Sequence, residues 1–246
     1  DSLLRLAVEK RDEYIIDKLH ENGSNMAPAL SYAILSFVNF EESEQLFFKK
    51  LLRYGADINY YDSNRITSTP LICSVESKKC NNKVVDFLIK NGASVNMRDS
   101  RKKSIGFADE QPTAIYYAAK KSKAFAVRSL LDAGADPNLK GTGLPTPLHE
   151  SIGDLLIMKY LIEKGAKVNR IDMPYNGRTP IHYAALYLYP SSIEILLDKG
   201  AKCSTDTDGY TPLDLLYKHR DDVPSEQYNE CKRLLRDAGF YYNKYK

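Results

Sequence analysis

Apolar residues recur along this chain in short helical patterns that alternate with polar turns. The segment SSIEILLDK places Ile193, Leu196 and Leu197 on one face at the spacing of an α-helix. Gly200 follows it and can adopt the left-handed conformation with which helices commonly end. Upstream, the segment TPIHYAALY opens with Thr179, a good N-cap, and with a proline suited to the first helical position. The pattern predicts two short helices joined as a pair.

The same pair of segments recurs through the chain. Starts similar to the one at Thr179 occur at Thr69, Thr113, Thr146 and Thr211. Leucine-rich or similar apolar segments lead to the glycine landmarks Gly23, Gly55, Gly92, Gly134, Gly165, Gly200 and Gly239. The two kinds of landmark lie 21 residues apart from Thr113 to Gly134 and again from Thr179 to Gly200. A recurring distance between linked landmarks indicates a repeated structural unit.

Two short amphipathic helices cannot bury their apolar faces alone, so neighbouring units must stack and share one core. The seven glycine landmarks therefore predict a single all-α domain, a solenoid of seven antiparallel helix pairs with projecting hairpin loops. The first and last pairs are degenerate, as expected for units that turn one face to water. The predicted units are 1–25, 26–59, 60–96, 97–138, 139–169, 170–203 and 204–246.

The segments TPIHYAA, TAIYYAA and TPLHESI resemble the T-P-L-H-x-A-A start of the ankyrin repeat, a unit of about 33 residues. The resemblance extends over nearly the whole chain, and the irregular units are similar to those of ankyrin proteins from intracellular bacteria and large DNA viruses. It implies an ankyrin solenoid whose hairpin tips and first helices form a concave face that holds partner proteins. It also implies a structural role for His149 and His182, whose position in T-P-x-H ties adjacent repeats by hydrogen bonds.

Several units depart from the family pattern. The second unit lacks Thr-Pro and starts at Pro28, and the unit at Thr146 is two residues short between its helices. The last unit carries an insertion at 218–230. The loop 97–112 is much longer than an ordinary hairpin. We expect this loop to project and to be dispensable for folding, because loop-closure entropy changes slowly with loop length.

The charge balance argues against a dedicated nucleic-acid binder. The 246 residues include 35 basic and 32 acidic side chains, for a formal charge of +3. No apolar run approaches the roughly 20 residues that span a bilayer, so membrane insertion is not expected. The chain does not begin with Met, and we expect it to be a piece of a longer protein.

The cysteines form no CxxC pair and no dense framework, so neither structural zinc nor a disulfide scaffold is predicted. They are Cys73, Cys80, Cys203 and Cys231. We expect reduced thiols and a cytoplasmic location, either in the cell that makes the protein or in the cytosol of a host after secretion.

No motif in the sequence predicts catalysis. H-E-x-x-H, G-x-S-x-G, a P-loop and G-x-G-x-x-G are absent. His20 and His219 are isolated, with no carboxylate or cysteine at catalytic or metal-ligand spacing. We therefore expect no enzymatic activity, no metal site and no cofactor.

Basic and aromatic residues in the hairpin tips and near the ends of first helices are the candidate partner-binding residues. Such residue types are typical anchors of protein interfaces. The basic run Arg98, Arg101, Lys102 and Lys103 is a solvated loop, a docking element for an acidic partner, or a contact for nucleic acid or membrane headgroups. The candidate residues are Tyr61, Arg65, Arg98, Arg101, Lys121, Tyr175, Arg178, Tyr187 and Tyr210. By contrast, Tyr32, Tyr117 and Tyr183 share a position that faces the interior of the family's fold, so we expect them in the core.

The favoured function is a protein-protein interaction module that recruits or sequesters a partner with an acidic, partly apolar epitope, as an effector in a host cell. The alternative is the regulatory or substrate-binding segment of a larger enzyme whose catalytic domain lies outside this chain. Sensing of a small ligand in the concave groove is a third hypothesis, for which no convergent charges can be placed. Nothing in the sequence requires more than a monomer.

Overall fold

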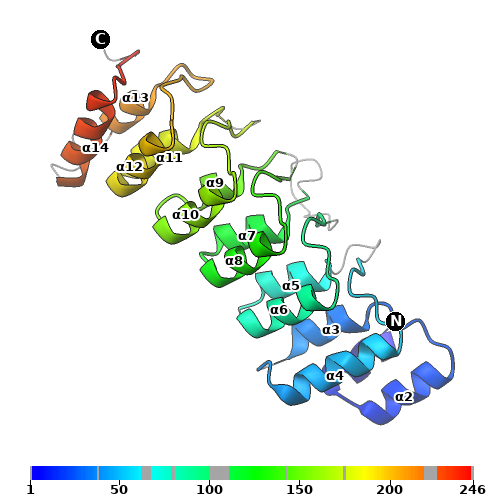
Figure 1. Ribbon diagram of the computed structural model, residues 1–246. Helices are drawn as coiled ribbons and strands as arrows, with labels where there is room; N and C mark the ends of the chain where they lie inside the picture. Colours follow the sequence, from blue (N-terminus) through cyan, green and yellow to red (C-terminus); the bar gives the residue numbers. More distant parts are fainter. Residues whose placement is uncertain are drawn as a thin grey trace.

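The computed structural model is an elongated, curved stack of short helices with the two termini at opposite ends (Figure 1). It describes residues 2–37, 39–61, 68–78, 81–99, 111–141, 143–173, 176–218 and 226–244. Within these residues there are fourteen helices in seven pairs, as predicted. The pairs are α1 (Ser2–Lys10) with α2 (Glu13–Glu21), α3 (Ala29–Ser36) with α4 (Glu42–Arg53), α5 (Pro70–Glu76) with α6 (Asn82–Lys90), α7 (Ala114–Lys120) with α8 (Ala124–Asp132), α9 (Pro147–Glu150) with α10 (Leu155–Glu163), α11 (Pro180–Leu186) with α12 (Pro190–Asp198), and α13 (Pro212–Tyr217) with α14 (Glu226–Asp237).

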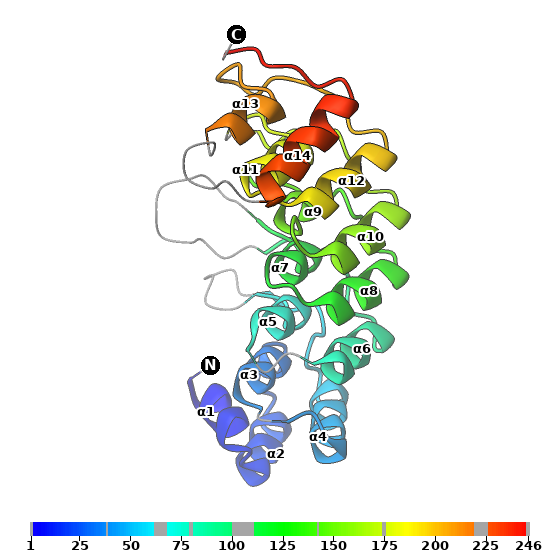
Figure 2. The same cartoon turned by 90° about the vertical axis from the view of Figure 1, so that its left-hand side faces the viewer.

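The helices form two layers. The first helices of the pairs, from α1 through α13, pack side by side in chain order, and α6 through α14 form the second layer beside them (Figure 2). Hairpin loops connect one pair to the next and extend to one side of the stack (Figure 1). The predicted all-α solenoid of helix pairs is confirmed, and the exact unit boundaries stay a prediction.

The helix boundaries follow the residues that the sequence places there. Thr69 caps α5 by accepting a hydrogen bond from the backbone N–H of Ile72 (3.3 Å), and proline occupies the first turn of that helix. At the other end of a pair, Gly200 has φ +81°, a conformation that favours glycine. The next N–H, of Ala201, reaches back to the carbonyl of Leu196 (2.9 Å) and closes α12.

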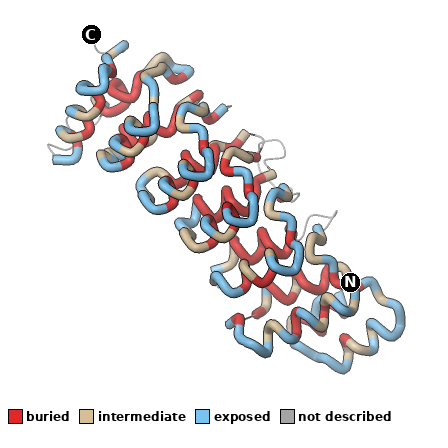
Figure 3. Tube along the Cα trace, in the orientation of Figure 1, coloured by how far each residue is buried: buried red, intermediate tan, exposed pale blue. Residues whose placement is uncertain are grey.

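One continuous core runs between the two layers through every pair, and the buried segments follow the axis of the stack (Figure 3). In α11, Ala184 and Ala185 are fully buried, and in α7 the equivalent Ala118 and Ala119 are too. Small side chains let neighbouring first helices approach closely, while the leucines and isoleucines of the second helices fill the space between layers. Each unit therefore completes the core of its neighbours.

The irregular units keep the same architecture. Helix α9 has only four residues, whereas α7 and α11 have seven each. The base of the long loop is closed by a hydrogen bond from the N–H of Asp99 to the carbonyl of Pro112 (2.8 Å). Residues 100–110 lie outside the described part of the chain, so the expectation that this loop projects stays a prediction.

Candidate functional site

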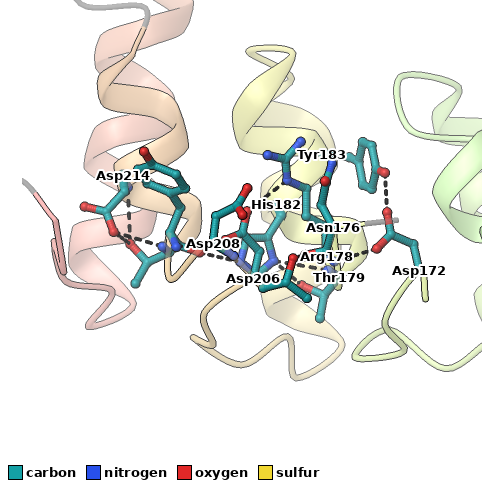
Figure 4. Close-up of polar contacts among 12 residues, drawn as sticks. Asp172, Asn176, Arg178, Thr179, His182, Tyr183, Asp206, Asp208 and Asp214 are labelled. Atoms are coloured by element: carbon teal, nitrogen blue, oxygen red, sulfur yellow. Dashed lines mark hydrogen bonds and ion pairs between the residues drawn. The ribbon is translucent and has the colours of Figure 1, made fainter. Parts of the chain in front are cut away.

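The Thr-Pro-x-His segment of α11 ties its unit to the next one. Nδ1 of His182 accepts from the backbone N–H of Thr179 (3.1 Å) and contacts its hydroxyl (2.8 Å). Because Nδ1 accepts, the neutral ring carries its proton on Nε2, which donates to the carbonyl of Tyr210 in the following hairpin (3.2 Å). Figure 4 shows this chain of contacts between the two units.

The preceding unit repeats the arrangement. Nδ1 of His149 accepts from the N–H of Thr146 (3.2 Å), and Nε2 donates to the carbonyl of Arg178 (3.1 Å). These bonds confirm that both histidines link adjacent units. Each ring therefore has both nitrogens engaged in structural hydrogen bonds.

The backbone carbonyl that accepts the histidine hydrogen bond also accepts a second hydrogen bond, which closes its own hairpin. The N–H of Asp206 donates to the carbonyl of Tyr210 (2.8 Å), and the N–H of Asp172 donates to that of Arg178 (3.0 Å). Both aspartates are buried. Hairpins of different length thus present the same acceptor to the unit before them.

Burial sets the protonation of these histidines. It lowers the pKa of His149 to about 4 and also lowers the pKa of His182, because a charged imidazole is poorly solvated in the interior. Both rings are therefore neutral near pH 7, the state in which Nδ1 can accept.

Two other units place different residues at the histidine position. In α7 the residue is Tyr116, whose hydroxyl donates across the stack to Oε1 of Glu150 on α9 (2.7 Å). In α13 it is Asp214, whose Oδ2 accepts from the N–H of Thr211 (2.9 Å). Oδ1 of Asp214 also accepts from the N–H of Asn243 in the C-terminal segment (3.0 Å), so a link to the following segment is kept while its chemistry changes.

The predicted partner-binding residues fall into three groups. Tyr61 and Tyr187 are exposed, at 52% and 56%. Arg65, Arg101 and Tyr175 lie outside the described residues. The remaining four have contacts within the protein: Arg98, Lys121, Arg178 and Tyr210.

Arg98 and Lys121 each donate to a backbone carbonyl of another unit. The guanidinium of Arg98 bonds the carbonyl of Lys140 (2.9 Å), and Nζ of Lys121 bonds that of Glu76 at the end of α5 (2.8 Å). Cations at the carboxyl end of a helix are favourable. These two side chains support the stack, whatever they offer to a partner.

Arg178 and Tyr210 are also engaged. Nε of Arg178 lies 3.1 Å from the carboxylate of Asp206, and only 13% of the arginine side chain is exposed. The ring of Tyr210 has the ammonium groups of Lys218 and Lys244 at 3.9 and 4.4 Å from its centroid. The contacts of the six predicted residues that the structure describes do not join them into one cluster, and the role of all nine in binding stays a prediction.

The expectation that three tyrosines are core residues is confirmed for Tyr117 only. Tyr117 is buried, and its hydroxyl donates to the carboxylate of Asp99 (3.0 Å). Tyr32 and Tyr183 are half-buried instead. The hydroxyl of Tyr183 donates to the buried Asp172, while part of its ring stays open because the neighbouring helix α9 is short.

A hollow beside α9 was missed from the sequence. It has a volume of about 360 Å³ and is lined by side chains of α7, α9 and α11 and their flanking loops, among them Tyr116, Lys120, Glu150 and Tyr183. The missing two residues of the unit at Thr146 were visible in the sequence and could have indicated a gap. The sequence does not indicate which side chains line the hollow, because they come from three units that meet only in the folded stack.

Three family models match segments of the chain, and all three describe ankyrin repeats. The model for three ankyrin copies covers residues 101–172, that for many copies covers 153–197, and that for a single repeat covers 68–100. Together with the helix pairs and the Thr-Pro-x-His links, these matches show that the chain belongs to the ankyrin repeat family. The fold and the family are those of protein-protein interaction modules.

Among its relatives, an ankyrin repeat protein of fowlpox virus (strain NVSL) is 30% identical over 172 residues, which are 65% of this chain and 47% of the relative. The human transient receptor potential cation channel subfamily A member 1 is 25% identical over 66% of the chain and 17% of its own length. The human SH3 and multiple ankyrin repeat domains protein 2 is 29% identical over 77% of the chain and 9% of its length. The chain thus spans about half or less of each of these relatives.

No helix within the described residues is long and apolar enough to cross a membrane. No group of three or more His, Cys, Asp or Glu side chains in the same residues could hold a metal ion.

Proposed function

We propose that this chain recruits or sequesters a partner protein on the face formed by its hairpins and first helices. The observation that carries the proposal is a row of tyrosines at the end of α11. The rings of Tyr183 and Tyr187 lie 6.1 Å apart, and those of Tyr187 and Tyr189 lie 6.4 Å apart. Tyr187 and Tyr189 are 56% and 42% exposed. Contiguous exposed aromatic side chains are characteristic of interaction sites.

Tyrosine suits this role for a physical reason. Its flat ring offers a large apolar area while losing little conformational entropy, and its hydroxyl can pair with a partner at the rim of the interface. Tyr187 and Tyr189 flank the turn between α11 and α12, so their backbone is held by the core beneath. A partner that covers them therefore gains buried area without ordering a loop.

The proposed partner carries an acidic and partly apolar epitope. The apolar part would cover the tyrosines, and the acidic part would face the basic side chains of the loop that includes Arg98 and Arg101. Opposite charge mainly accelerates association and makes it sensitive to salt. No interaction with nucleic acid or membrane is part of this proposal, and the protein acts as a monomer.

The cellular setting is also proposed. The similarity to an ankyrin repeat protein of a poxvirus supports a role as an effector in the cytoplasm of a host cell. The alternative is a regulatory or substrate-binding segment of a larger protein, an enzyme among the options. It is favoured by the small share of the two human relatives, 17% and 9%, that the chain spans.

The test begins with isolation of a binding protein and measurement of its affinity for variants of the chain. Tyr187→Ala combined with Tyr189→Ala should weaken binding by about tenfold or more, about 1.4 kcal/mol. Tyr14→Ala is the control, because Tyr14 is 72% exposed on α2 at the other end of the stack. Arg98→Glu with Arg101→Glu should reduce the association rate and its salt dependence. Equal affinity of the tyrosine variant and the control would move the binding site to another face.

A further inference from the structure

The hollow beside α9 arises from the shortness of that helix. Helices α7 and α11 continue for three residues beyond the length of α9, so their last turns enclose a space that α9 does not fill. The space has a volume of about 360 Å³. Such a volume accepts one long side chain and lies at the lower end for sites of small ligands.

Aromatic rings form part of the walls of the hollow, beside the aliphatic side chains of Leu144, Pro145 and Ile152. Tyr183 and Tyr187 lie on its α11 side with their ring planes at 32° to each other, and the ring of His149 meets Tyr183 edge to face at 5.7 Å. Tyr116 lies on its α7 side. The faces of tyrosine rings carry negative electrostatic potential and attract cations.

One carboxylate lies in the hollow. Oε1 of Glu150 accepts the hydrogen bond of the Tyr116 hydroxyl (2.7 Å) and is 3.8 Å from Nζ of Lys120. Both of these contacts use Oε1, so Oε2 retains its capacity to accept. The carboxylate is also well shielded, since only 20% of the side chain is exposed.

The chain places one of its own cations at the rim of this site. Nζ of Lys120 is 3.2 Å from the Tyr116 hydroxyl and 5.4 Å from the centroid of its ring. The lysine side chain is 52% exposed, and its 3.8 Å approach to Glu150 is near the limit for an ion pair. Such a loose, exposed pair contributes little free energy, so a better-fitting cation can displace it.

We propose that this hollow binds an arginine side chain presented by the partner protein. A guanidinium is flat and stacks against tyrosine faces, and it donates two parallel hydrogen bonds to a carboxylate. A lysine would offer only a compact, strongly hydrated point charge. An anion would be repelled by Glu150, and a purely apolar side chain would cover the remaining exposed part of the carboxylate without donating a hydrogen bond to it. The inference rests on the proposed function and refines it: the epitope is acidic where it faces the loop that includes Arg98, and it presents one arginine among its apolar groups where it covers the tyrosines.

The test uses short peptides and needs no identified partner. The probes are acetylated, amidated pentapeptides of sequence Gly-Ser-X-Ser-Gly, in which X is arginine, lysine or citrulline. Citrulline has the shape of arginine without its charge. Binding is followed by NMR of the assigned ring signals of Tyr183 and Tyr187 during titration to tens of millimolar peptide.

We expect saturable shifts with the arginine peptide at an affinity about tenfold above that of the citrulline peptide, because a charge-assisted pair is lost. The lysine peptide should bind several-fold more weakly than the arginine peptide. Glu150→Gln keeps the acceptor for Tyr116 but removes the charge, and it should abolish the preference for arginine over citrulline. Lys120→Met removes the competing cation and should strengthen arginine binding. Tyr14→Ala is the control and should leave all three affinities unchanged.

Absence of saturable shifts, or equal affinity for the arginine and citrulline peptides, overturns the proposal. Equal affinity for arginine and lysine peptides overturns the assignment to arginine. Failure of the proposed function has a different signature: the arginine peptide binds, but the tyrosine variants leave the affinity of a captured protein unchanged.

Discussion

The two ends of the stack hold together by different physical means. Toward the C-terminus, units from α9 onward are linked by directed hydrogen bonds such as that from Nε2 of His182 to the carbonyl of Tyr210. Toward the N-terminus, the units of α3 to α6 meet through a cluster of phenylalanines. The cluster consists of Phe37, Phe40, Phe48 and Phe87, whose ring centroids lie 5.1 to 6.2 Å apart in the pairs that make contact.

This difference explains why the Thr-Pro-x-His motif is recognisable toward the C-terminus and less so toward the N-terminus. A hydrogen bond between units needs a particular donor at a particular position, and Thr-Pro-x-His supplies it. Burial of apolar rings requires only the right volume and shape, which many residues satisfy. The N-terminal units can therefore lose Thr-Pro-x-His and still stack.

The largest expected effect comes from removing the centre of the phenylalanine cluster. Phe48 is fully buried, so Phe48→Ala should lower the free energy of unfolding of the N-terminal units by about 3–5 kcal/mol. Because units couple mainly to their neighbours, amide exchange should accelerate in α3–α6 and stay slow in α11–α13. Equal acceleration at both ends, measured by hydrogen exchange with mass spectrometry, would contradict the separation.

The next effect concerns pH. The pKa of His149 is lowered by burial from 6.5 to about 4, so between these values the unfolded chain binds more protons than the folded one. The free energy of unfolding should therefore be greatest above about pH 6.5 and fall by about 3 kcal/mol as the pH drops toward 4. The lowered pKa of His182 acts in the same direction.

Urea unfolding at several pH values between 7 and 4 measures this dependence. His149→Gln is the control, because it removes the titrating ring and should flatten the curve by the share that His149 contributes. A curve of unchanged slope in that variant would show that other groups cause the acid sensitivity. The phenylalanine contacts at the N-terminal end do not titrate.

Deleting a linking histidine should have an intermediate effect. His182 is fully buried, and His182→Ala leaves the N–H of Thr179 and the carbonyl of Tyr210 without this partner. The free energy of unfolding should fall by about 1–3 kcal/mol. His20→Ala is the matched substitution at the other end. His20 is exposed and stacks on Tyr54 at 4.1 Å, so its loss should cost no more than about 1 kcal/mol by the same denaturation assay.

The sequence predicted the fold because the fold is local and repeated. Thr caps, prolines and glycines at fixed spacing specify each helix pair, and the T-P-x-H position identified His149 and His182 as links. The candidate site was less predictable, because exposure depends on neighbours that sequence does not place. Arg178 looked like a free cation in a hairpin, yet the buried Asp206 of the next hairpin binds it. Glu150 and Tyr116 meet across two units, a contact that no motif in the sequence indicates.

The smallest expected effect concerns a turn that both ends of the stack share. Arg11, Ser122 and Leu188 each lie between the two helices of a pair with φ between +50° and +59°. Their N–H groups bond the carbonyl three residues earlier, which identifies the three turns as equivalent. Residues other than glycine are strained by about 1–2 kcal/mol in this left-handed conformation.

The effect of a glycine substitution at these turns on the free energy of unfolding should depend on what the replaced side chain contacts. Ser122 is exposed, so Ser122→Gly should raise the free energy of unfolding, but by no more than about 1 kcal/mol because glycine also loses more backbone entropy on folding. Leu188 is partly buried against the core, so Leu188→Gly should instead lower it, since part of the about 1.5–3 kcal/mol that a fully buried leucine side chain contributes is lost. Opposite signs in thermal melts of the two variants would support this account. A gain in both would mean that the backbone strain outweighs the packing of Leu188.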